Sequence, residues 1–124
     1  MRVVQLITAC GIVLTTAAAA DAQGIDWAKV DGILGRTGAV GGAVHRYGFP
    51  RTDLQVTLDG VTIRPTLALG GWVAFEPMGN MAMAMGDLVL LQSEVSSVMA
   101  KLLEGGLQVT ALHNHLLRAE PLTF

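Results

Sequence analysis

Residues 54–63 read LQVTLDGVTI, and this stretch carries the clearest local structural pattern in the chain. Apolar and polar side chains alternate as far as Leu58, which is the period of a half-buried strand. Asp59-Gly60 follows, a dipeptide that favours a type I′ turn because both central residues of that turn need positive φ. Since the alternation resumes over 61–63, we predict a β-hairpin that ends before Pro65, which cannot donate to a ladder.

Two segments on either side of this hairpin predict helices. Asp26 is a suitable N-cap for a short amphipathic helix over 26–34, and Gly35 can end that helix. Ser93 is a similar N-cap for a second helix, with Glu94 in its first turn, where the helix dipole favours an anion. Apolar residues at helical spacing continue this second pattern to Leu103.

The remaining segments give the fold class. The apolar runs over 72–75, 81–91 and 107–113 are typical of strands, and the glycine-rich segment 37–48 is typical of a loop or irregular strand. Together they predict one α+β domain with a small mixed or antiparallel sheet and two helices packed on one face. The expected core residues are Val56, Leu58, Trp72, Phe75, Leu88 and Leu90, covered by Leu102.

The N-terminus predicts export. Arg2 precedes an uncharged apolar run that ends in alanines, and 20–22 has the small-x-small pattern of a cleavage site. We therefore expect a signal peptide over 1–22, a single domain over 23–124, and a secreted or periplasmic location. The alternative is a lipoprotein, because Cys10 lies in a loose lipidation box. The run is too polar for a spanning helix, so we expect no membrane span after processing.

Charge and motifs narrow the function classes. The 124 residues carry 8 Lys and Arg against 10 Asp and Glu, a net charge of −2 with no basic run, which excludes nucleic acid as a partner. The only cysteine, Cys10, lies in the expected signal peptide, so no disulfide is expected. Sequence motifs for a nucleophile, a phosphate loop or a zinc protease are absent, and whether the chain is an enzyme stays open.

Four short segments follow one another in a specific order: FPRTDL at 49–54, MGDLVL at 85–90, Glu94-Val95, and ALHNHLL at 111–117. Together they resemble the LppY/LpqO family, also described as the DUF1259 domain, over about residues 27–118. The resemblance implies an exported bacterial protein without an established activity. It also implies a second His-x-His segment that this sequence does not contain. We therefore expect a truncated chain, completed by a missing second half or by a homo-oligomer.

His113 and His115 are the leading candidates for chemistry. Two residues apart in a strand, they would share a face and could offer two ligands to a divalent metal such as zinc. The alternative, which the pair taken alone favours, is that they bond backbone carbonyls at a strand end; the second pair implied by the family adds weight to the metal without removing this alternative. His45 could be a third ligand. Asp87 and Glu94 are possible carboxylate ligands, although they are equally typical of a turn and a helix start.

Two further groups complete the candidates. Arg51 and Asp53 could bind a ligand or pair with each other. The methionines at 81, 83 and 85 share a face if their segment is a strand; they could bind Cu(I) or, as methionines more commonly do, pack a core. Two function classes therefore stay open: an extracytoplasmic binding or structural module, or an incomplete half of a metal-dependent enzyme or metal-binding protein that uses the His-x-His pair.

Overall fold

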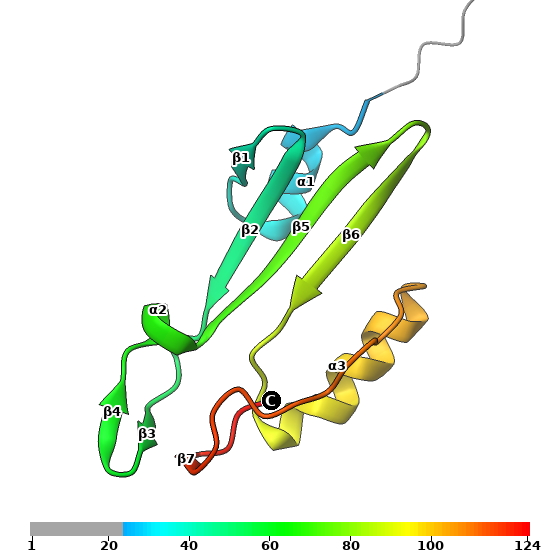
Figure 1. The fold of residues 1–124 in the computed structure, drawn as a ribbon. Coiled ribbons are helices and arrows are strands. Elements are labelled where there is room, and N and C mark those ends of the chain that lie inside the picture. The colour runs from blue at the N-terminus through cyan, green and yellow to red at the C-terminus, as the bar shows by residue number, and fades with distance from the viewer. Residues whose placement is uncertain (1–23) are drawn as a thin grey trace, which may run out of the picture.

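The computed structural model describes residues 24–124 as two antiparallel sheets and three helices (Figure 1). The expected signal peptide over 1–22, with Cys10, lies outside the described residues. Within residues 24–124 no helix is both long enough and apolar enough to cross a membrane. The predicted α+β class with antiparallel pairing is confirmed, and the strands are divided between two sheets.

The larger sheet has the strand order β1-β2-β5-β6. Its strands are β1 (Ala39–Gly41), β2 (Val44–Pro50), β5 (Gly70–Met78) and β6 (Met81–Asp87). Strands β5 and β6 form a long hairpin, and because β2 pairs with β5 only as far as Phe75, the tip of the hairpin extends beyond β2 (Figure 1). In its register Phe75 lies opposite both His45 of β2 and Ala84 of β6. The expected strands at 72–75 and 81–91 therefore exist, the second one ending at Asp87.

The glycine-rich segment 37–48, expected as a loop or irregular strand, instead forms most of the β1–β2 hairpin. Gly42 has a φ of 62°, so the glycine supplies the turn rather than preventing strand pairing. Tyr47 of β2 is completely buried, and its hydroxyl donates a 2.8 Å hydrogen bond to Asp31. Burial and this hydrogen bond raise the pKa of Tyr47.

The first helix, α1 (Trp27–Leu34), matches the predicted one. The Asp26 side chain accepts a 3.1 Å hydrogen bond from the backbone of Lys29, and Gly35 ends the helix in the left-handed conformation. The bond from Tyr47 to Asp31 holds α1 against one face of the larger sheet.

The smaller sheet has the order β4-β3-β7. Its strands are β3 (Val56–Leu58), β4 (Val61–Ile63) and β7 (Ala119–Glu120). Asp59 and Gly60 have φ values of 50° and 81°, so the predicted type I′ hairpin is confirmed. Pro65 ends the strand as expected and opens the short helix α2 (Pro65–Ala68).

The best-buried core lies beside the smaller sheet. It is formed by Val56, Leu69, Val89 and Ala119, with Leu54, Ile63 and Leu116 packed around it. The expected burial of Val56 is confirmed. The other expected core residues are only half-buried: Leu58, Trp72, Phe75, Leu88, Leu90 and Leu102. The chain leaves the larger sheet after Asp87, so Val89 enters this core, while Leu102 lines a hollow of about 360 Å³ against the larger sheet.

The third helix, α3 (Gln92–Glu104), begins earlier than predicted. Its N-cap is Leu91, and the prediction of Ser93 as the cap was wrong. The Glu94 carboxylate, at the third position of the helix, reaches back to accept a 2.8 Å hydrogen bond from the backbone N–H of Leu91.

The segment after α3 runs back along the helix without forming a strand (Figure 1). The expected strand over 107–113 was therefore wrong, because no strand of the described chain pairs with it. Phe124 at the end of the chain exchanges hydrogen bonds of 2.7 and 2.8 Å with Leu90, which ties this segment to the start of α3.

Candidate metal centre

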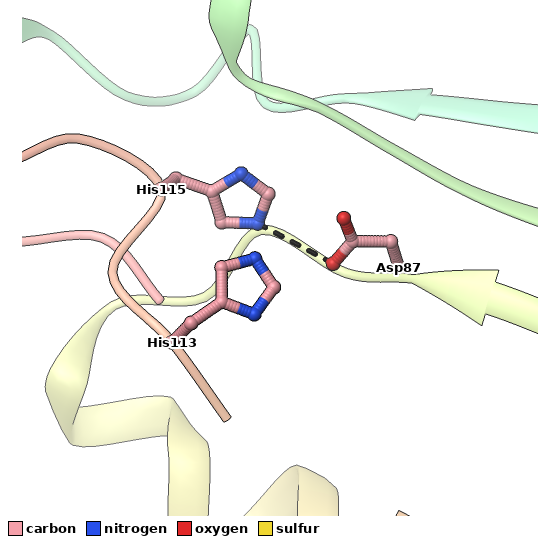
Figure 2. Close-up of side chains that lie close together, drawn as sticks. All are labelled: Asp87, His113 and His115. Atoms are coloured by element: carbon pink, nitrogen blue, oxygen red, sulfur yellow. Dashed lines mark ion pairs between the residues drawn. The ribbon is translucent and has the colours of Figure 1, made fainter. Parts of the chain in front are cut away.

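Asp87, His113 and His115 each bring one ligand atom into a cluster in which all three atoms lie within 4.8 Å of one another. Asp87 ends β6, and the histidines come from the segment that returns past α3 (Figure 2). The Nε2 atom of His115 is 3.5 Å from a carboxylate oxygen of Asp87. The two imidazole rings have centroids 5.2 Å apart and planes tilted by 40°.

The two histidines face each other although no strand holds them. The backbone N–H of His115 donates a 2.9 Å hydrogen bond to the carbonyl of Thr123, which is completely buried. The ring Nε2 of His115 lies 3.3 Å from the carbonyl oxygen of Leu88. Contacts with two distant segments therefore set the direction of this ring, and the period of a strand does not.

The cluster is open on one side. The side chain of His115 is 15% exposed and that of Asp87 is 41% exposed, while His113 lies at the surface. A hollow of about 340 Å³ adjoins the cluster and is lined in part by Asp87, His113, Leu90, Met99 and Thr110. A small molecule in this hollow can therefore reach Asp87 and His113.

Two imidazole nitrogens and one carboxylate oxygen form a donor set that suits borderline divalent ions. A tetrahedral zinc ion with bonds of about 2.0–2.1 Å holds its ligand atoms roughly 3.4 Å apart. The 3.5 Å between His115 and Asp87 already has this spacing. Only His113, at the exposed edge, has to move closer for all three residues to bind one ion.

His45 lies elsewhere. Its ring stacks on Trp27 with centroids 3.5 Å apart and planes within 3° of parallel. In the larger sheet it stands opposite Phe75, two strands away from β6. The structure therefore brings His113 and His115 together with Asp87, and places His45 under α1.

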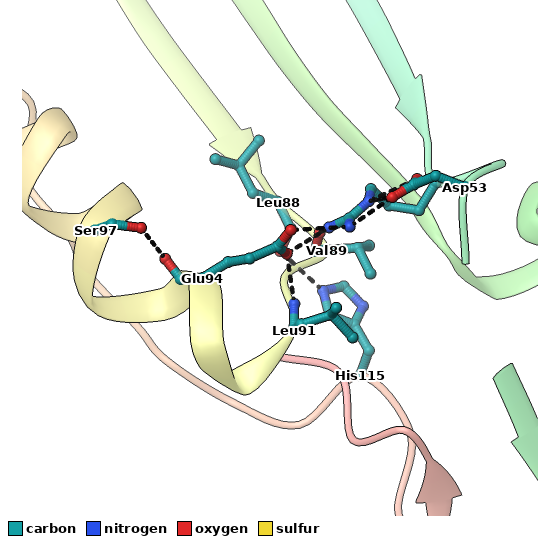
Figure 3. Close-up of polar contacts among 8 residues, drawn as sticks. Asp53, Leu88, Val89, Leu91, Glu94, Ser97 and His115 are labelled. Atoms are coloured by element: carbon teal, nitrogen blue, oxygen red, sulfur yellow. Dashed lines mark hydrogen bonds and ion pairs between the residues drawn. The ribbon is translucent and has the colours of Figure 1, made fainter. Parts of the chain in front are cut away.

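Arg51 and Asp53 pair with each other, which was one of the two sequence-based expectations. Nε and Nη2 of Arg51 each donate a 2.9 Å bond to the Asp53 carboxylate. Nη1 and Nη2 donate bonds of 2.7 and 3.1 Å to Glu94, and Nη1 also donates to the carbonyl of Val89 at 2.8 Å (Figure 3). All five N–H groups of the guanidinium therefore have acceptors inside the protein. Binding of an external ligand by Arg51 and Asp53 stays a prediction.

The charges in this network stabilise one another. Hydrogen bonds from Arg51 lower the pKa of Asp53 and of Glu94 below their usual values. The same contacts, with Asp53 contributing most, raise the pKa of the guanidinium, whose side chain is 18% exposed. The network joins the loop after β2 to the start of α3 and so positions the segment that follows Asp87.

One feature of the sequence marked Asp87 as a possible ligand. It is the only charged residue in the run 81–91, where an apolar strand would otherwise continue. Sequence reasoning named it as one of two possible carboxylate ligands, and in the structure its carboxylate lies beside the two histidines. Glu94, the other one, is held by Arg51 and by the backbone of Leu91.

Comparison with known proteins places the chain in a family. A model of the family described as Domain of Unknown Function (DUF1259) matches residues 28–124, which include the candidate centre and both sheets. No curated protein and no solved structure matches the chain. With more than three quarters of its length matched, the chain belongs to the DUF1259 family.

Proposed function

We propose that this chain is an extracytoplasmic binding module of the LppY/LpqO type that holds one divalent transition-metal ion between Asp87, His113 and His115. The observation that carries the proposal is the convergence of the three ligand atoms within 4.8 Å, from segments on either side of α3. Zinc suits this set of ligands, with water in the position that the protein leaves open.

The competing explanation is that the histidines only satisfy backbone carbonyls. The contact between His115 Nε2 and Leu88 is 3.3 Å, longer than the usual range of 2.7–3.2 Å for an N–H···O bond. It is also shared with Asp87, because the same nitrogen lies 3.5 Å from that carboxylate. A nitrogen placed between two oxygens at long distance is well positioned to exchange its proton for a metal ion.

Calorimetry with Zn²⁺, Cu²⁺ and Ni²⁺ tests the proposal. We expect one ion per chain, and at least about tenfold weaker binding in the double variant His113→Ala, His115→Ala and in Asp87→Ala, a change of about 1.4 kcal/mol in binding free energy. His45→Ala is the matched control, because His45 is stacked on Trp27 and should leave the affinity unchanged. Equal binding by wild type and the double variant would exclude the histidine pair as ligands.

A second function, a metal-dependent enzyme, is favoured by the hollow beside the cluster. Catalytic zinc sites keep three protein ligands and one position for water, whose pKa the ion lowers. A Co²⁺-loaded sample titrated with azide tests for that position. A change in the visible spectrum supports an open position that substrate could reach, and an unchanged spectrum supports a closed binding site.

The export of the chain belongs to the same proposal. Arg2 and the uncharged run that follows support a signal peptide over 1–22 and a secreted or periplasmic protein, with lipidation at Cys10 as the alternative. The resemblance to the LppY/LpqO family supports a second His-x-His segment near the centre, from a further half or from a second copy. Light scattering with and without Zn²⁺ distinguishes these sources. If a second copy of the chain supplies the segment, the mass of the particle in solution should double when Zn²⁺ is added, whereas a further half would leave it unchanged.

A further inference from the structure

The β5–β6 hairpin carries four exposed methionines. Met78, Met81, Met83 and Met85 are 50%, 69%, 46% and 59% exposed. A methionine in a strand usually packs in a core, where its flexible side chain fills gaps. These four side chains are not in the core of the described chain, so core packing does not explain them.

The register of the hairpin places all four on one face. Met78 lies directly opposite Met81, and Met83 and Met85 follow Met81 at every second position of β6. Directly opposite residues have Cβ atoms about 4.5–5.5 Å apart, and alternate residues of a strand are roughly 7 Å apart. We call this surface the methionine face. Because each side chain has three rotatable bonds, neighbouring thioether sulfurs can reach a common point above it.

The charge on this hairpin favours a cation. Glu76 is the only charged residue over 70–86, and it lies opposite Met83 with its side chain exposed. The cation nearest along this face is Arg46, whose guanidinium packs 3.8 Å above the ring of Trp72. The methionine face therefore has soft sulfur donors and one carboxylate, without a positive charge among them.

We infer that the methionine face binds a soft monovalent cation, Cu(I), through the sulfurs of Met78, Met81 and Met83, with Met85 as the next donor along β6. Thioethers are soft ligands that select Cu(I) over the divalent ions suited to imidazole and carboxylate. This site is distinct from the cluster of Asp87, His113 and His115, and it does not depend on the function proposed for that cluster. The binding involves no change in oxidation state.

Ag(I), which has the same charge and a similar preference for sulfur, is the probe for the first experiment. Calorimetry is done in chloride-free buffer on chains that carry Cys10→Ser, because a thiolate would bind the probe. We expect one Ag(I) per chain, and at least about tenfold weaker binding when 78, 81 and 83 are all changed from Met to Leu. Leucine keeps the apolar surface while removing the sulfur, so a role in docking a protein would not produce this loss.

Two controls separate the methionine face from other donors. Met99→Leu removes a thioether that lines the hollow beside α3, and it should leave Ag(I) binding unchanged. The double variant His113→Ala, His115→Ala should also keep it. A wild-type chain that does not bind Ag(I), or a triple Met→Leu variant that binds it equally well, would overturn the inference.

A second measurement needs no variant. In a sample with ¹³C-labelled methionine methyl groups, Ag(I) or anaerobic Cu(I) should shift the signals of Met78, Met81 and Met83 and leave that of Met99 in place. Uniform shifts of all methyl signals, or none, would contradict a local site. Zn²⁺ added to the same sample should leave the methyl signals of the methionine face unchanged.

Discussion

Arg51 and Glu94 lie 43 positions apart in the chain, and their side chains are joined by two hydrogen bonds of 2.7 and 3.1 Å. Glu94 also accepts from the backbone of Leu91, so one carboxylate both caps α3 and fastens it to the loop after β2 (Figure 3). Asp87 lies between these two anchors in the sequence. The pair is therefore a support for the candidate centre.

The support should depend on pH. Arg51 lowers the pKa of Glu94 below its usual value of 4.5, so the ionised carboxylate stabilises the folded chain above that pH. This stabilisation is lost as the pH falls through the lower value of the folded state. We expect Glu94→Gln to reduce the free energy of unfolding by about 1 kcal/mol at neutral pH, and the difference from wild type to shrink as the pH falls below 4.5. Urea unfolding at several pH values measures it.

Glu104→Gln in the same helix is the control for that experiment. Glu104 pairs with Lys101 through side chains that are 66% and 82% exposed, and such surface pairs contribute little. Its effect should be near zero at every pH. If the loss in Glu94→Gln is the same at all pH values, the carboxylate charge is not its cause.

The small core can be tested with two leucines of the same short segment. Leu69 is completely buried against Val56, whereas Leu67 is 78% exposed. Replacing Leu69 with Ala should lower the free energy of unfolding by about 2–5 kcal/mol because it leaves a cavity. Leu67→Ala should change it by under about 0.5 kcal/mol. Similar losses for both variants in thermal or urea unfolding would place the core elsewhere.

The type I′ turn gives a prediction about backbone strain alone. Gly60 has a φ of 81°, and a Cβ atom added there would meet nothing within 4 Å. Gly60→Ala should therefore destabilise the chain by about 1–2 kcal/mol through its conformation, and Gly60→Asn by less, since Asn tolerates this region better. Equal losses for Ala and Asn in the same unfolding assay would contradict that explanation.

Export makes a prediction about the N-terminus. If 1–22 is cleaved, the sequence of the mature protein recovered from the periplasm or medium begins at Gln23. Mass spectrometry of the same material distinguishes an acylated Cys10. Recovery of Met1 on soluble cytoplasmic protein would contradict both routes.

The sequence predicted correctly those turns and helix ends that neighbouring residues determine. Asp59-Gly60 determines its turn through backbone conformation, and Asp26 with Gly35 determines both ends of α1, so both were found. The start of α3 was misplaced because Glu94 caps the helix from inside it and is itself held by Arg51. No pattern within the helix sequence contains that contact.

The sequence-based predictions that were wrong concern segments whose structure depends on contacts with distant parts of the chain. Residues 107–113 have the composition of a strand, but a strand needs a neighbour to pair with, and α3 lies there instead. Likewise, the spacing of His113 and His115 predicted their shared direction for a strand that does not form. The contacts of His115 with Thr123 and Leu88 set the direction of its ring instead, and no spacing rule predicts such contacts.

Asp87 precedes α3 and the two histidines follow it, so an ion bound by all three closes a loop that contains the whole helix. Closing a loop of this kind restricts the unfolded chain, and the restriction grows with the length of the loop. An ion bound by all three residues would therefore add to the anchoring of α3 that Arg51 and Glu94 already provide. Removal of the ion by a chelator would open this loop, while the hydrogen bonds between Arg51 and Glu94 still held the start of the helix.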